Sequence, residues 1–213
     1  MSPRPRTVTD GQILEATGRI IGRLGPARFT LADVAAEIGL APATLVQRFG
    51  SKRGLMLALA GSSVEFVDAC FARIRDANPA PLAALRVAAT HMASMVESPE
   101  SLANHLAFLQ IDLSDPDFHA LALDNHLRIE AGYRALLDDA VAAGELAPCD
   151  TARLARAVGA VAGGSLIGWA ITRGGDVVTH VREDVDTLLA PYAAAAARTS
   201  AAPARRRRAR TSS

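Results

Sequence analysis

The side chains best spaced to bind a metal ion are His119, His126 and Glu130, since intervals of seven and four residues share one face of a helix. A bundle metal site takes further ligands from a second helix, commonly through a Glu-x-x-His pair, and the sequence contains no such pair. The nucleophile motif Gly-x-Ser-x-Gly and a glycine-rich phosphate loop are also absent from the sequence. We therefore expect no catalytic residue, no metal and no cofactor.

Charge is distributed unevenly along the chain, although the net charge is only +1. Residues 1–53 carry eight basic and four acidic side chains, residues 54–204 carry ten and eighteen, and the last nine residues carry five arginines. A basic N-terminal region on an acidic middle favours contact between that region and a polyanion. Ordinary variation in surface charge is the alternative interpretation.

The composition favours an all-helical protein. Half of the 213 residues are hydrophobic but only 4% are aromatic, and alanine, the best helix former, is abundant. The two cysteines exclude a disulfide framework. The N-terminus does not resemble a signal peptide, and the uncharged run at 157–172 is shorter than a bilayer span. We expect a soluble, cytoplasmic protein.

Apolar periodicity and capping residues predict about nine helices. A helix begins near Thr9 or Asp10 and ends at Leu24, before Gly25-Pro26. Later helices are predicted at 31–38, 42–49, 51–77, 81–97, 99–113, 116–143, 151–173 and 181–190. No internal repeat is evident, and residues 197–213 are expected to form a disordered basic tail.

The segment from Thr30 to Phe49 has the pattern of a helix-turn-helix. Thr30 and Asp33 predict a capping box, and Gly39 accepts the left-handed conformation of a tight turn. The inward-facing apolar residues would be Val34, Ile38, Leu40, Leu45 and Phe49. Such a motif places its second helix in the major groove of DNA.

These residues resemble the TetR family of bacterial repressors. The similarity covers about residues 9–60 and is carried by the sequence 29–40, Ala43-Thr44-Leu45, Phe49, Ser51-Lys52 and Leu55. It implies an all-α homodimer without catalytic residues. In that fold a small DNA-binding domain, here residues 1–53, precedes a larger domain for ligand binding and dimerisation, here residues 54–196.

The resemblance also implies the DNA contacts, which we assign to Thr30, Pro42, Ala43, Thr44, Val46, Gln47, Arg48 and Lys52. Gln47 can pair with adenine and Val46 can touch a thymine methyl group, whereas Arg48 and Lys52 would bind phosphate. The family usually has tyrosine at Val46 and glycine at Ala43, so the base contacts should differ from the usual ones. Lys52 as a solvated lysine is the alternative. Arg4 and Arg6 would enter a minor groove or belong to an unstructured start.

Small residues four apart in the segment 151–173 predict close helix packing. We assign Gly159, Gly163, Val185 and Leu189 to a dimer interface formed with the following helix. A crowded contact within one chain would explain the glycines equally well.

An apolar or weakly polar ligand would bind between the predicted helices of the larger domain. The residues proposed to line its site are Met92, Met95, His105, Phe108, Leu109, His126, Leu127, Tyr133 and Trp169. The helix 51–77 is expected to be the only element that links ligand and DNA sites. The partners expected are palindromic operator DNA, a small-molecule effector and a second copy of the chain, with no membrane. The alternative is an all-helical small-molecule or metal-binding protein, or a helical adaptor, without a DNA role.

Overall fold

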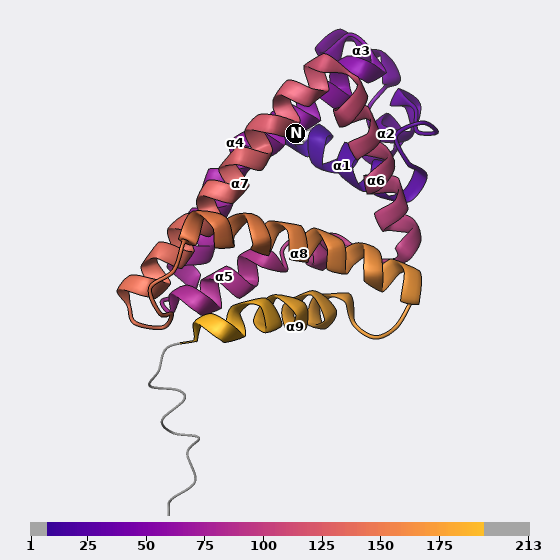
Figure 1. The fold of residues 1–213 in the computed structure, drawn as a ribbon. Coiled ribbons are helices and arrows are strands. Elements are labelled where there is room, and N and C mark those ends of the chain that lie inside the picture. Colours follow the sequence, from indigo (N-terminus) through magenta and orange to yellow (C-terminus); the bar gives the residue numbers. More distant parts are fainter. Residues whose placement is uncertain (1–7, 194–213) are drawn as a thin grey trace, which may run out of the picture.

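The computed structural model describes residues 8–193, and the regular elements of this range are helices joined by short turns (Figure 1). Two 3-10 turns, Ala93–Met95 and Ala190–Tyr192, and an isolated bridge between Leu146 and Ala193 complete its secondary structure. The predicted all-α fold is confirmed. The predicted tail and the arginines at positions 4 and 6 lie outside the described residues.

The first four helices begin at the caps that the sequence predicts. They are α1 (Asp10–Leu24), α2 (Leu31–Glu37), α3 (Pro42–Phe49) and α4 (Lys52–Ala77). Thr9 and Thr30 each close a capping box: the threonine side chain accepts a hydrogen bond from a backbone N–H three residues on, and that residue's side chain accepts one from the threonine N–H. The Ser51 side chain accepts from the Gly54 N–H and starts α4. We call α1–α3 with the first turn of α4 the head.

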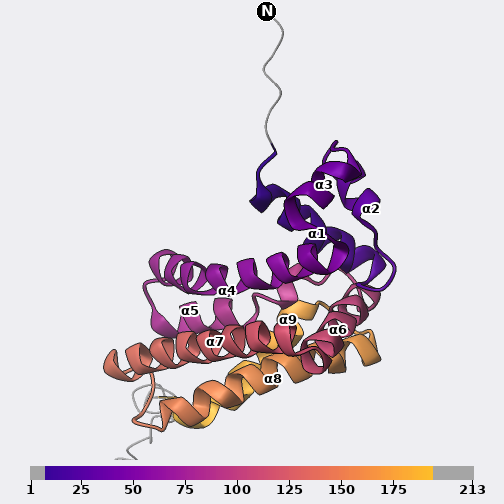
Figure 2. The same cartoon turned by 90° about the horizontal axis from the view of Figure 1, so that it is seen from above.

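The rest of the described chain, which we call the body, contains α5 (Pro81–Ala89), α6 (Pro99–Ser114), α7 (Pro116–Ala142), α8 (Thr151–Thr172) and α9 (Val177–Leu189). In both ribbon views α4 and α7 run side by side along one flank and α8 and α9 along another (Figures 1 and 2). Helix α6 connects the second flank to the head (Figure 1).

Two predicted helices have different boundaries. The helix predicted at 81–97 ends at Ala89, where the Thr90 hydroxyl donates a 2.8 Å hydrogen bond to the Arg86 carbonyl, a contact that bends helices. Helix α9 begins at Val177 rather than at residue 181, because the Asp176 carboxylate accepts from the Thr179 N–H and caps it.

The head and the body each have a hydrophobic core. The fully buried residues of the head include Ile13, Phe29, Val34, Leu45 and Leu55. The body core is built mainly from α5, α7, α8 and α9, and its largest fully buried residues are Leu85, Leu136, Leu137, Val158, Val181 and Val185. The head core also takes Leu55 and Met56 from the first turn of α4.

Helix α4 is not the only helix that links the two cores. Phe118 of α7 is buried in the head core, and Phe108 of α6 packs edge-on against it with ring centroids 5.9 Å apart. Asp115 and Pro116 reverse the chain beside the head and bring both rings to its apolar surface. Helices α4, α6 and α7 therefore all connect head and body.

Two described helices, α4 and α8, are long and apolar enough to span a membrane by length and composition. We expected the uncharged run at 157–172 to be too short to span a bilayer, but helix α8 as a whole has 22 residues. Both helices contribute to the body core, where α4 packs against α7 and α8 packs against α7 and α9.

Candidate nucleic-acid interface

The turn between α2 and α3 gives α3 one buried and one exposed face. Gly39 has φ +69°, and the Leu40 N–H donates a 2.9 Å hydrogen bond to the Ala35 carbonyl. Leu45 is fully buried against the head, whereas Val46 is 49% exposed. Leu45 is the one buried residue of α3, so the outer face of this helix is open to a partner.

The close approach of α3 and α4 depends on a glycine that the sequence analysis overlooked. A Cβ atom on Gly54 would lie 2.1 Å from the Phe49 carbonyl oxygen, which is backbone and cannot rotate away. Gly54 therefore sets the corner between α3 and α4. The sequence did contain a signal for this role, because glycine is unusual inside the first turn of a predicted helix.

Two of the predicted phosphate ligands have partners within the head. The Thr30 hydroxyl donates to an Asp33 carboxylate oxygen at 2.7 Å and is used in capping α2. Lys52 donates to the Ala27 carbonyl at 3.0 Å, and its Nζ lies 4.4 Å from the centroid of the Phe29 ring. Partial burial lowers the pKa of Lys52. An ammonium has three donors, so Lys52 keeps two for a phosphate.

Arg48 fastens α3 to the start of α1. Its Nε lies 3.0 Å from Asp10 Oδ1, and its Nη1 donates to the Val8 carbonyl at 2.8 Å. These contacts give Arg48 a structural role that the sequence analysis did not predict. Its phosphate contact stays a prediction, carried by the remaining guanidinium donors.

The other predicted DNA-contacting residues lie on the outer side of α3. Pro42, Ala43, Val46 and Gln47 are exposed, and Thr44 is half-buried. Gln47 makes no side-chain hydrogen bond within residues 8–193 that would compete with a base. The structure thus brings these side chains onto one surface, and their contacts with bases stay predictions.

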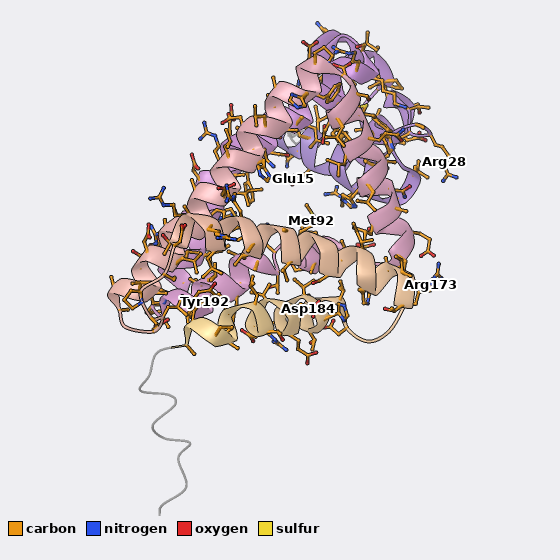
Figure 3. All side chains as sticks on the ribbon, in the orientation of Figure 1. Glu15, Arg28, Met92, Arg173, Asp184 and Tyr192 are labelled. Carbon is orange, nitrogen blue, oxygen red and sulfur yellow. The ribbon has the colours of Figure 1, made fainter. Side chains whose placement is uncertain are left out.

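The residues predicted to line a ligand site divide into an exposed and a buried group. Met92, Met95, Leu109 and Leu127 are each about half exposed, and the His126 side chain is 73% exposed. Met92 extends into the opening framed by α4, α6, α7 and α8 (Figure 3). These residues do not enclose a single cavity.

The buried group serves the cores instead. The Trp169 indole N–H donates to the Gly175 carbonyl at 3.1 Å, and Tyr133 packs edge-on against Phe71, with burial raising its pKa to about 12. His105 holds the Ser101 carbonyl through Nδ1 at 2.8 Å. Phe108 belongs to the contact between head and body. These side chains have packing roles within the chain, and their part in a ligand site stays a prediction.

Two of the residues predicted for a dimer interface lie inside the chain's own core. Val185 is fully buried and Leu189 is 4% exposed, because this stripe of α9 packs onto the body. Gly159 faces Tyr133, whose Cε2 would be 3.8 Å from an added Cβ, so it serves a contact within the chain. Gly163 is exposed, and an added Cβ would meet nothing within 4 Å.

An open groove of about 290 Å³ lies between α6 and α8. Its apolar lining includes Leu102, Leu106, Ile167 and Ile171. Within residues 8–193 no three His, Cys, Asp or Glu side chains are grouped to hold a metal ion. His126 and Glu130 approach to 3.8 Å, but His119 does not join them.

Residues 13–59 match the sequence model of a family described as bacterial regulatory proteins, tetR family. No curated protein matches the sequence. A TetR-family transcriptional regulator from Cytophaga hutchinsonii has 16% identity and a TM-score of 0.68, over 88% of this chain and 98% of that one.

Two further solved structures share the fold. The transcriptional regulator FadR from Bacillus subtilis, in complex with stearoyl-CoA, has 15% identity and a TM-score of 0.66 over 85% of this chain and 98% of its own. The ketosteroid transcriptional regulator KstR2 of Mycobacterium tuberculosis has 17% identity and a TM-score of 0.59, over 88% and 97%. Residues 13–59 thus match the DNA-binding domain of the TetR family, and the described chain has the fold of TetR-family transcriptional regulators.

Proposed function

We propose that the protein is a repressor that binds a palindromic operator as a homodimer and leaves it when a small apolar or weakly polar ligand binds the body. The observation that carries this proposal is the outer face of α3, which is exposed, nearly uncharged and rigidly held. Gly54 and Leu45 fix α3 from behind, and Arg48 fastens it to α1. A rigid helix with exposed Val46 and Gln47 suits the reading of base edges in a major groove.

Within this proposal, Gln47 pairs with adenine and Val46 touches a thymine methyl group. Pro42, Ala43 and Thr44 lie close to the bases, where small side chains allow the helix to approach. Lys52 binds phosphate at the N-terminus of α4, which adds the positive end of the helix dipole. DNA and its regulator would meet in the cytoplasm.

The second copy would cover α8. The exposed residues on one face of this helix are small or apolar, namely Ala160, Gly163, Gly164, Ile167 and Ile171. Glycines let two helices approach closely, and an apolar patch of this kind favours association. Two heads joined in this way would read two half-sites.

The body would bind the effector through its exposed apolar side chains. Met92, Met95, Leu109 and Leu127 offer flexible apolar surface, which suits ligands of varied shape. The FadR complex contains stearoyl-CoA, which joins a long apolar acyl chain to a charged coenzyme A, and another relative is named for ketosteroids, so this fold accepts a ligand with a large apolar part. The boundaries of the sensing domain, 54–196, stay part of the proposal.

An electrophoretic mobility shift with the DNA upstream of the protein's own gene tests the proposal. We expect a discrete complex that weakens steeply with salt, and Gln47→Ala should bind the same DNA less selectively while remaining folded. Binding that is equally strong to unrelated DNA would contradict a sequence-reading role. An absence of DNA binding, together with metal in elemental analysis, would favour the metal-binding alternative.

A further inference from the structure

A single arginine joins the head to the corner between α6 and α7. Arg53 Nη2 lies 2.9 Å from Oδ1 and from Oδ2 of Asp115, and 2.8 Å from Asp117 Oδ2. Its guanidinium carbon lies 5.5 Å from the centroid of the Phe118 ring. One side chain of α4 therefore contacts the cap, the first turn and the buried anchor of α7.

Arg53 follows Lys52 in the sequence but points to a different side of α4. Adjacent helical residues are about 100° apart around the axis. Lys52 turns toward Ala27 and Phe29 in the head, whereas Arg53 turns toward the body. Of the two basic residues at the start of α4, Lys52 therefore contacts the head and Arg53 contacts the body.

The carboxylate that Arg53 binds already organises the corner. Asp115 caps α7, and its Oδ1 accepts a 3.0 Å hydrogen bond from the Asp117 N–H. The hydrogen bond from Arg53 holds the pKa of Asp115 below its ordinary value, and the hydrogen bonds to Asp117 and then Asp115 raise the pKa of Arg53. Arg53 and Asp115 therefore stay charged at neutral pH.

A second contact holds the far end of α1. The Asn104 side chain of α6 donates a 2.8 Å hydrogen bond to the Gly22 carbonyl, and a Cβ on Gly25 would lie 2.7 Å from Asn104 Oδ1. Helix α6 thus touches the head through Asn104 and Phe108, and the corner after it does so through Arg53. Contacts at separate places fix the angle of the head.

We propose that Arg53 is a positioning residue that binds Asp115 and Asp117, fixes the angle of the head on the body and so sets the spacing of the two α3 helices on DNA. This inference rests on the proposed function. Arg53 makes no DNA contact in this account. Exposed ion pairs contribute little to stability, and Phe118 stays buried without them, so loss of the cluster should alter orientation before it alters folding.

Removing a negative charge near the head distinguishes a positioning role from simple electrostatic attraction to DNA, because the two predict opposite changes in DNA affinity. Asp117→Asn removes a negative charge from the head side of the body, which by electrostatics alone strengthens binding to every DNA. If Arg53 positions the head, Asp117→Asn should instead weaken binding to a duplex that contains both half-sites. Asp124→Asn, an exposed carboxylate of α7 paired with Arg128, is the matched control because it does not touch the head.

The test uses the full-length protein and three probes: a duplex that it selects from random-sequence DNA, one half of that duplex, and a scrambled duplex of equal length. For Arg53→Gln we expect affinity for the full site to fall about tenfold, and for Asp117→Asn about threefold, with the half-site and scrambled probes changed less than about twofold. Arg53→Lys should restore part of the loss, Asp124→Asn should change nothing, and melting temperatures should stay close to that of the wild type.

Equal losses on all three probes for Arg53→Gln would make Arg53 a phosphate ligand and overturn the inference. Unchanged or tighter full-site binding by Asp117→Asn would also overturn it, while leaving the proposed function intact. If the wild type selects no duplex, the proposed function and this inference both fail. If Arg53→Gln does not fold, the ratio of full-site to half-site binding in Arg53→Lys and Asp117→Asn decides.

Discussion

The head and the body differ in how many large apolar side chains they leave exposed to solvent. Among the described residues, Val46 of α3 is the one large apolar side chain of the head that is markedly exposed. The body exposes a larger set: Phe66, Val87, Met92, Met95, Leu106, Leu109, Leu113, Leu123, Leu127, Ile167 and Ile171. Extensive exposed apolar surface marks binding sites. The head thus leaves little apolar surface exposed beyond Val46, whereas the body leaves apolar surfaces that would suit a ligand and a second copy in the proposed function.

The largest expected effect comes from a substitution that disrupts the packing of the head alone. Gly54→Ala forces a Cβ against the Phe49 carbonyl, so we expect α3 to shift, stability to fall by about 3 kcal/mol and DNA binding to be lost. Gly61→Ala in the same helix meets nothing within 4 Å and should be neutral or stabilising by up to about 1 kcal/mol. Thermal unfolding measures both, and equal stability of the two variants would refute the role of Gly54.

The next largest effect should come from a substitution on the exposed face of α8, which would weaken the dimer. Gly163→Leu should leave the single chain folded, because nothing within 4 Å opposes the new side chain, but should separate two α8 helices and weaken dimers by about 1–3 kcal/mol. Sedimentation velocity measures the dimer, with exposed Ala72→Leu of α4 as the control. A wild-type monomer, or a Gly163→Leu dimer of undiminished affinity, would contradict the assigned interface.

Within the head, base and phosphate contacts should separate. Gln47→Ala should relax preference at one base pair by about 1–3 kcal/mol, and Lys52→Ala should weaken all sequences alike and lower the salt slope by about one. Competition binding over a range of salt concentrations measures both. A change in base preference for Lys52→Ala with an intact salt slope would reverse the assignment.

The smallest effect is the pH dependence of the head. Hydrogen bonds lower the pKa values of Asp33 (from Thr30) and Glu37 (from Arg23). A lowered folded pKa stabilises the protein above the unfolded pKa, near 4, and this contribution is lost as pH falls through the folded value. The melting temperature should therefore fall below about pH 4. Asp33→Asn should reduce that fall, and an identical profile would count against the capping contribution.

The sequence predicted the head better than the body because local rules determine it. Capping residues at Thr9, Thr30 and Ser51 and the turn at Gly39 act through neighbours three or four positions away, and all four appear as predicted. The predicted start of α9 at residue 181 was wrong because the capping signal of Asp176, which is present in the sequence, was overlooked.

The candidate sites were less predictable because they depend on contacts distant in sequence. Val185 and Leu189 form a stripe whether they face the body or a partner, and periodicity cannot distinguish these alternatives. Trp169, the single tryptophan, could line a ligand site or fill the core, and it is buried in the body core. Arg53 and Asp117 are 64 positions apart, and no local pattern pairs them.

Hydrogen exchange of the full-length protein with and without its selected duplex tests the division into a DNA-reading head and a sensing body most directly. The account predicts that DNA slows exchange in α3 and in the first turns of α2 and α4, with α8 and α9 unchanged when the dimer is present in both samples. Protection concentrated on α8 and α9, with α3 exchanging as freely as before, would contradict it.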